Sequence, residues 1–218
     1  MVDKGLDIGF AYDGDADRCI AVDHRGNIID GDKIMYVCGK YLREKGQLNG
    51  NTVVTTVMSN LGLYKSLERE GIDYEQTAVG DKYVAENMME NNYSIGGHII
   101  FSRYSATGDG ILTSLMIMEA CVDQKATLCD LAKEMKVYPQ LLRNVRVSDK
   151  KTALENEKVK ASIEAAAEAL GDDGRILVRE SGTEPLIRVM VEAGTDELCH
   201  KYVDSVVDVM EAEGLVVE

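Results

Sequence analysis

Three aspartates near the N-terminus, Asp13, Asp15 and Asp17, have the residue type and spacing of a cation site. They stand at every second position, so an extended or tightly curled loop can point all three carboxylates the same way. Crowded carboxylates repel one another, and a hard divalent cation such as Mg²⁺ or Ca²⁺ makes the arrangement favourable because these ions prefer oxygen ligands. Arg18 follows directly and adds a planar cation of the kind that pairs with phosphate. The stretch therefore predicts a cation site beside an anion-binding arginine.

The element expected to position this loop is the apolar run from Leu6 to Ala11, which predicts a buried strand. Carboxylates at the C-terminal end of such a strand lie where α/β proteins bind ligands. An acidic surface turn and a calcium loop of the EF-hand type are the alternatives. The EF-hand pattern is not met, because neither Gly nor Glu follows Asp17 at the required spacing and strands flank the loop. We favour metal binding over a surface turn.

Composition bounds the class of protein. The 218 residues are enough for one or two domains, and the net charge of −14 argues against nucleic acid or an anionic membrane as partner. The five cysteines are scattered and odd in number, which predicts reduced core thiols rather than disulfides or a zinc site. The sequence shows neither a signal peptide nor an apolar run long enough to span a bilayer, so we expect a cytoplasmic protein.

The order of predicted elements indicates the fold class. Strands and helices alternate between residues 30 and 135, which predicts an α/β/α layered domain with a mostly parallel sheet. Tyr138-Pro139-Gln140 marks a linker. Beyond it, a long helix from Lys151 to Leu170, three strands and a last amphipathic helix predict a small α+β C-terminal domain.

A second polar loop joins two of those C-terminal strands and has the composition of an anion site. Glycine permits close backbone approach, hydroxyl and free N–H groups can surround an anion, and arginine adds charge. From the residues alone, a polar hairpin loop explains the stretch equally well. The candidate phosphate-binding residues are Arg179, Ser181, Gly182, Thr183 and Arg188.

Together these motifs resemble the α-D-phosphohexomutase superfamily. Asp-Gly-Asp-Ala-Asp-Arg after an apolar strand resembles its metal loop. Arg-x-Ser-Gly-Thr-Glu-Pro resembles the phosphate loop of its phosphoglucosamine mutase branch, whereas the phosphomannomutase branch more often has Asn in place of Gly182. The metal loop implies a catalytic role for Arg18, which would stabilise the charge of the transferring phosphoryl group. Gly80-Asp81-Lys82 resembles a loop whose basic residue reaches the substrate, which implies a catalytic role for Lys82. The same residues also fit a helix N-terminus with a dipole-stabilising Asp.

The sequence departs from the superfamily pattern at two places. The sugar-binding loop of the family reads Gly-Gly-Glu-Gln-Ser-Gly-His, and here His98 follows Gly97 directly, so the Glu and Ser that hold sugar hydroxyls have no counterpart. His98 matches the sugar-binding His of the family, although a lone His at a strand start also fits a structural role. Either the protein lacks the four residues Glu-Gln-Ser-Gly of the family's loop, or four mobile residues are missing between Gly97 and His98. We predict a break between these two residues, and an ordinary peptide bond there would mean a real deletion. Second, no Ser-His-Asn-Pro-like loop, which carries the phosphorylated serine in the family, occurs in the sequence.

The resemblance implies a C-terminal portion of a four-domain enzyme. Residues 1–28 would be the remainder of domain 2 with the metal loop, 29–140 domain 3, and 141–218 the phosphate-binding domain 4. It also implies Mg²⁺ as cofactor, a hexosamine phosphate substrate, and the missing N-terminal domains as partners; a homodimer is left open.

The complete enzyme would interconvert glucosamine 6-phosphate and glucosamine 1-phosphate through a phosphoserine and a bisphosphate intermediate, supplying UDP-N-acetylglucosamine for cell-wall synthesis. This chain alone would be inactive. The alternatives are a phosphomannomutase or phosphoglucomutase of the same superfamily, and a non-catalytic sugar-phosphate or metal-binding fragment. A phosphatase with an aspartate nucleophile is disfavoured, since its further Thr/Ser and Lys motifs are not found in the expected order.

Overall fold

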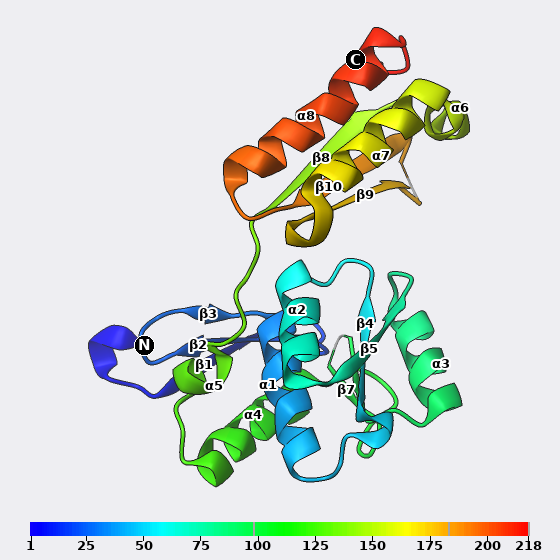
Figure 1. The fold of residues 1–218 in the computed structure, drawn as a ribbon. Helices are drawn as coiled ribbons and strands as arrows, with labels where there is room; N and C mark the ends of the chain where they lie inside the picture. The colour runs from blue at the N-terminus through cyan, green and yellow to red at the C-terminus, as the bar shows by residue number, and fades with distance from the viewer. Residues whose placement is uncertain (98, 183, 218) are drawn as a thin grey trace. The chain divides into compact units, whose positions relative to one another are not determined.

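The computed structural model describes residues 1–97, 99–182 and 184–217. It divides into two compact units, Met1–Lys136 (unit 1) and Val137–Glu218 (unit 2). Both mix helices with sheets (Figure 1), as the sequence predicts for the fold class. The proposed division of the chain at residues 28 and 140 stays a prediction.

The larger sheet of unit 1 has the strand order β5-β4-β6-β7, with β4, β5 and β6 parallel and β7 antiparallel. The predicted mostly parallel sheet is thus confirmed. Its strands are β4 (Thr52–Thr56), β5 (Asp73–Thr77), β6 (Ile95–Gly96) and β7 (Ile100–Phe101). The helices of the unit are α1 (Gly31–Glu44), α2 (Leu61–Glu70), α3 (Asp81–Asn91), α4 (Gly110–Gln124) and α5 (Leu128–Ala132), with 3₁₀ turns η1 (Val2–Lys4) and η2 (Asn49–Asn51).

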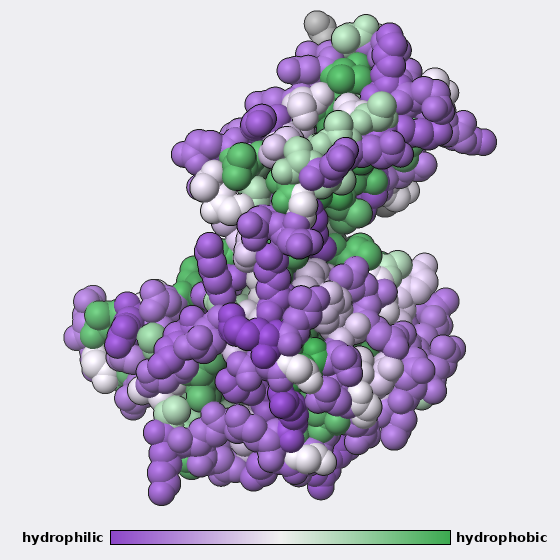
Figure 2. Space-filling model, viewed as in Figure 1, coloured by the Kyte–Doolittle hydropathy of each residue, from purple (hydrophilic) through white to green (hydrophobic). Residues whose placement is uncertain are grey.

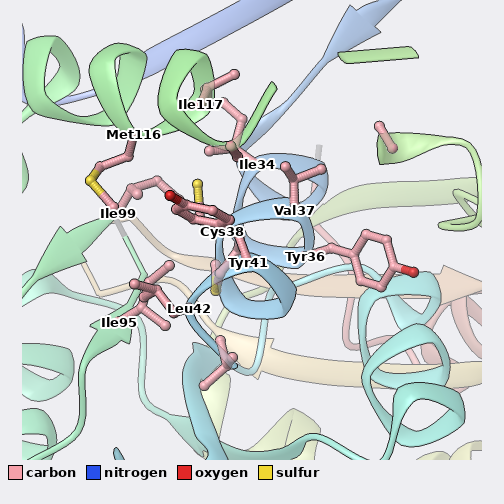
Figure 3. Packing of buried hydrophobic residues seen from close by; sticks show 14 of the residues in the cluster. Ile34, Tyr36, Val37, Cys38, Tyr41, Leu42, Ile95, Ile99, Met116 and Ile117 are labelled. Atoms are coloured by element: carbon pink, nitrogen blue, oxygen red, sulfur yellow. The ribbon is translucent and has the colours of Figure 1, made fainter. Parts of the chain in front are cut away.

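Helices cover both faces of this sheet. Neighbouring side chains of a strand point to opposite faces, and in β4 Val53 belongs to the core cluster containing α1, α2 and α4, while Val54 belongs to the cluster containing α3. Figure 3 shows α1 at the centre of the first cluster, with Met116 and Ile117 of α4 beside it. The layers are therefore α/β/α.

The aspartate loop belongs to a separate antiparallel sheet with the order β1-β2-β3. Its strands are β1 (Ile8–Tyr12), β2 (Cys19–Asp23) and β3 (Ile28–Ile29). The expectation of a buried strand before the loop is wrong, because β1 is an edge strand whose residues are half-buried or exposed. The loop is therefore the turn of a hairpin, not the carboxyl end of a parallel strand.

Unit 2 is a three-stranded antiparallel sheet of order β8-β10-β9 packed against two long helices. The predicted single helix from Lys151 to Leu170 is wrong: Asn156 has extended backbone angles and its side chain accepts the Lys158 and Val159 amides, which starts a new helix. The elements are β8 (Gln140–Arg146), α6 (Lys150–Glu155), α7 (Glu157–Leu170), η3 (Gly171–Asp173), β9 (Arg175–Glu180), β10 (Leu186–Glu192) and α8 (Asp196–Ala212).

The surface of the protein is largely hydrophilic on the face shown in Figure 2, as the net charge of −14 leads one to expect. Within the described residues, every helix is too short or too polar to cross a membrane.

Candidate functional site

The aspartate loop brings its three carboxylates together. One carboxylate oxygen from each of Asp13, Asp15 and Asp17 lies within 4.8 Å of the others. Ala16 makes this possible by adopting a left-handed backbone conformation with φ 58°, and its amide donates to the Asp13 carbonyl at 3.2 Å. The curled backbone turns the alternate side chains toward one point, an arrangement suited to a cation with oxygen ligands.

Arg18 offsets part of the negative charge of this cluster. Its backbone amide donates to Asp13 Oδ1 at 3.1 Å, and its Nε lies 3.0 Å from Asp13 Oδ2 and 3.6 Å from Asp17 Oδ1. The hydrogen bond from the Arg18 amide holds the pKa of Asp13 below its ordinary value. Arg18 keeps 63% of its side chain exposed. It can therefore also meet an anionic ligand.

One oxygen of the cluster accepts no hydrogen bond. Asp17 Oδ1 is shielded from solvent, and among the described residues it forms an ion pair with Arg18 Nε at 3.6 Å but accepts no hydrogen bond. A buried acceptor that receives no hydrogen bond costs free energy, on the order of 1–3 kcal/mol. A cation at the common point would offset this cost, so the residues fit Mg²⁺, the ion that the family resemblance implies.

The N-terminal part of α4 supports the aspartate loop. The Gly110 amide donates to the Ala16 carbonyl at 2.9 Å, and the Tyr12 hydroxyl donates to Ser114 Oγ at 3.0 Å. These contacts connect positions about a hundred residues apart in sequence. The sequence did not predict a contact between α4 and the aspartate loop, because such a long-range contact leaves no local pattern.

The candidate phosphate loop of unit 2 lies between β9 and β10. Arg179 and Arg188 are register partners on these strands, and Arg188 Nε is buried without a hydrogen-bond partner among the described residues. Directly opposed like charges destabilise a sheet. A bound anion would offset this repulsion and satisfy Arg188 Nε, so the geometry suits phosphate.

The turn itself is fixed by backbone contacts. Ser181 is 1% exposed, and its amide donates to the Leu186 carbonyl at 2.9 Å. Gly182 is exposed and has open space where a Cβ would stand. Thr183, the remaining candidate in this loop, lies outside the described residues.

Lys150 is a neighbour of the phosphate loop that sequence reasoning missed. It is the first residue of α6, and its Nζ donates to the Ser181 carbonyl at 2.7 Å and lies 3.6 Å from Glu180 Oε2. Nothing in the local sequence distinguishes it from an ordinary surface lysine. Its position follows from the tertiary fold, which packs α6 beside the turn.

The structure leaves the other two candidates apart from these clusters. Lys82 lies in the first turn of α3, is 77% exposed and pairs with Glu86 at 3.7 Å. His98 lies outside the described residues, and so does the predicted break beside it. The short connection there ends in Ile99, which is 5% exposed and has φ 49°. This is an uncommon conformation for a β-branched residue.

Comparison with known proteins places the chain in a family. Residues 30–138 match the family model described as phosphoglucomutase/phosphomannomutase, alpha/beta/alpha domain III, and residues 142–209 match the C-terminal domain of the same family. The chain is 60% identical over 218 residues to a phosphoglucosamine mutase of Lachnoclostridium phytofermentans, covering 98% of this chain and 49% of that protein. It is 59% identical over 215 residues to the phosphoglucosamine mutase of Bacillus cytotoxicus, covering 97% and 48%.

Solved structures agree in fold, and all these relatives are longer. An N-acetylglucosamine-phosphate mutase in its product complex superposes with a TM-score of 0.76 at 22% identity, over 94% of this chain and 49% of that one. Aspergillus fumigatus N-acetylphosphoglucosamine mutase in complex with GlcNAc-6P and magnesium gives 0.72 at 22% identity, over 93% and 49%. The chain spans about half the length of the curated relatives it matches. It belongs to the phosphoglucomutase/phosphomannomutase family, the α-D-phosphohexomutases, and carries domain III and the C-terminal domain of that family.

Proposed function

We propose that this chain supplies the metal loop, a substrate-contacting loop and the phosphate loop of a phosphoglucosamine mutase. The enzyme interconverts glucosamine 6-phosphate and glucosamine 1-phosphate in the cytoplasm. The observation that carries the proposal is the convergence of three carboxylates within 4.8 Å, in a chain 60% identical to a phosphoglucosamine mutase.

Each residue cluster has a role in this proposal. Asp13, Asp15 and Asp17 hold Mg²⁺, which when bound offsets the negative charge of a transferring phosphoryl group. Arg18 contacts the same phosphoryl group. Lys82 reaches the substrate, and His98 contacts the sugar.

In unit 2, the phosphate that does not react binds to the phosphate loop. The residues proposed to hold it are Arg179, Ser181, Gly182, Thr183 and Arg188. The donor in the reaction is a phosphoserine, and the sugar passes through a bisphosphate.

The phosphoserine is proposed to come from an N-terminal half of the kind that the longer relatives carry. Exposed apolar side chains in unit 1 support such a partner. Ile20 is 47% and Ile28 is 63% exposed on the small sheet, and Leu115 and Val122 on α4 are 55% and 73% exposed. Leu6 is also 49% exposed, whereas Ile8 and Phe10 pack against the core. Apolar surface of this extent is typical of a contact with another chain or domain.

The experiment is a substrate comparison on the assembled protein. The chain is combined with the N-terminal half of the Lachnoclostridium phytofermentans relative, and mutase activity is measured with Mg²⁺ and a glucose 1,6-bisphosphate primer. Glucosamine 6-phosphate should be converted faster than mannose or glucose phosphates. Faster conversion of mannose or glucose phosphate would assign the chain to another branch of the family. Binding of phosphate without any conversion would indicate a non-catalytic fragment.

A further inference from the structure

We infer that Gly110, the first residue of α4, is a positioning residue that holds the aspartate loop in its cation-binding shape, with Ser114 as its second contact. The inference rests on the proposed metal site and assigns the support of that site to a helix outside the loop. Gly110 donates its amide proton to the carbonyl of Ala16, the residue between Asp15 and Asp17, at 2.9 Å.

The space around Gly110 excludes a side chain. A Cβ at this position would stand 2.6 Å from the Arg18 carbonyl oxygen, 2.9 Å from the Ala16 carbonyl oxygen and 2.9 Å from Tyr12 Cδ1. Two of these three atoms belong to the backbone of the loop and cannot rotate out of the way. Any side chain would therefore push the loop away from α4, and the carboxylates would move with it.

The contact also fixes the orientation of the curled backbone. Ala16 has φ 58°, a conformation that a residue other than glycine adopts at some cost. The Gly110 amide is free to stabilise it, because the Asp109 side chain that caps α4 accepts the Leu112 amide instead. The hydrogen bond to Ala16 therefore selects the conformation in which Asp15 and Asp17 lie on the same side.

Ser114 provides the second contact, one turn further along α4. Its Oγ accepts the Tyr12 hydroxyl proton at 3.0 Å and donates to the Ile111 carbonyl at 2.7 Å. Tyr12 immediately precedes Asp13, so α4 holds the start of the loop through Ser114 and its middle through Gly110. Mg²⁺ demands near-ideal octahedral geometry whereas Ca²⁺ tolerates irregular sites, so loss of this support should weaken Mg²⁺ more than Ca²⁺.

The chain contains a matched control for Gly110. Gly31 is the first residue of α1 and also follows a capping aspartate, Asp30, but a Cβ there would meet nothing within 4 Å. Gly31→Ala changes the same residue type at the same helix position without touching the loop. Any effect of glycine-to-alanine on helix propensity is common to both variants.

The test is Mn²⁺ binding to the full chain, followed by electron paramagnetic resonance, with Mg²⁺ and Ca²⁺ as competitors. Gly110→Ala should weaken Mn²⁺ binding about 10- to 100-fold, the range for loss of a residue that supports metal ligands. In Gly110→Ala, the affinity for Mg²⁺ measured by competition should fall more than the affinity for Ca²⁺. General destabilisation of the fold would not produce this change in selectivity. Ser114→Ala, which keeps the backbone contact, should weaken Mn²⁺ binding roughly fivefold, and Gly31→Ala should leave it unchanged.

Equal Mn²⁺ affinity in Gly110→Ala and Gly31→Ala overturns the inference. If Gly110→Ala does not fold, unchanged affinity in Ser114→Ala overturns it. If Asp15→Asn does not reduce Mn²⁺ binding to the chain, the proposed metal site is wrong. The role of Gly110 in holding the loop is then tested by measuring amide hydrogen exchange. The Ala16 and Arg18 amides should then exchange faster in Gly110→Ala than in Gly31→Ala, and equal exchange rates overturn the inference.

Discussion

At the scale of single residues, the two candidate sites share a physical pattern. Each gathers like charges and leaves one buried polar atom without a hydrogen bond among the described residues: Asp17 Oδ1 in the aspartate loop and Arg188 Nε beside the phosphate loop. Each arrangement is unfavourable by itself and becomes favourable when an ion of opposite charge binds. We therefore propose a phosphate in unit 2 on the same physical grounds as a cation in unit 1.

The first prediction concerns the opposed arginines. Arg179→Gln should raise the free energy of unfolding slightly without phosphate, by about 0.2–1 kcal/mol, because it removes a repulsive cross-strand pair. Inorganic phosphate should raise the melting temperature of the wild-type chain, since a ligand that binds the folded state stabilises it. The variant should lose most of that increase. Thermal unfolding with and without phosphate measures both effects.

Arg143→Gln is the control for this experiment. Arg143 also lies in the sheet of unit 2, but it forms a salt bridge with Asp204. This variant should keep the phosphate response and should not be stabilised. A phosphate response of the same size in wild type and Arg179→Gln would remove Arg179 from the site.

The second prediction is a pH dependence inside unit 1. Burial opposes ionisation of Glu70, but hydrogen bonds from Lys40 and Tyr36, both at 3.0 Å, lower its pKa below its ordinary value. A lowered pKa means that the contribution to stability is present above the unfolded pKa of about 4.3 and is lost as the pH falls through the folded pKa. Lys40→Met should therefore cost about 1 kcal/mol at pH 7, and the difference from wild type should shrink below about pH 4.

Urea unfolding at pH 7, 5 and 3.5 measures this dependence. Lys160→Met is the control, because Lys160 pairs with Glu157, whose side chain is 89% exposed. It should change stability little at any of these pH values. A cost for Lys40→Met that stays constant with pH would contradict the assigned role of Glu70.

At the scale of elements, the helices and strands that could be predicted are those determined by local sequence. The alternation of apolar and polar segments predicted the parallel sheet and its helices, because period and turn residues are local signals. Asn156 shows where this fails. The apolar face continues from Lys151 to Leu170, but the helix breaks at Asn156, whose side chain accepts the amides of Lys158 and Val159. The burial of β1 was predicted wrongly because it depends on which strands pair with it.

The residues of the candidate sites also fall into two groups, those predictable from local sequence and those that depend on the tertiary fold. The alternate spacing of the aspartates predicted their convergence, since loop geometry follows from neighbouring residues. Gly110 and Lys150 were not found, because each meets its loop only through the tertiary fold. A single sequence has no signal for such contacts.

The third prediction concerns the connection between β6 and β7. Insertion of Glu-Gln-Ser-Gly between Gly97 and His98 would restore the family's loop and lengthen the connection that ends in Ile99 at φ 49°. In the assembled protein, the KM for glucosamine 6-phosphate should fall at least about tenfold, because one hydrogen bond to a charged group contributes roughly 1.5–3 kcal/mol. Gly-Gln-Ala-Gly is the control of equal length. Equal KM values for both insertions would mean that the Glu and Ser do not contact the sugar.

At the scale of the whole molecule, the central claim is a division of labour. This chain spans about half the length of the curated relatives it matches, and we propose that it supplies the sites for a cation and a phosphate. Phosphoryl transfer also needs a donor positioned in line with the acceptor, and electrostatic stabilisation does not replace it. We therefore expect this chain to be necessary for activity and insufficient by itself.

The most direct test measures conversion of glucosamine 6-phosphate to glucosamine 1-phosphate, with Mg²⁺ and the bisphosphate primer, by three preparations: this chain alone, the N-terminal half of the Lachnoclostridium phytofermentans relative alone, and the two together. We predict turnover in the mixture, loss of that turnover when the chain carries Asp15→Ala, and no turnover by either half alone. Turnover by this chain alone, above that of its Asp15→Ala variant, would contradict the proposed need for both halves.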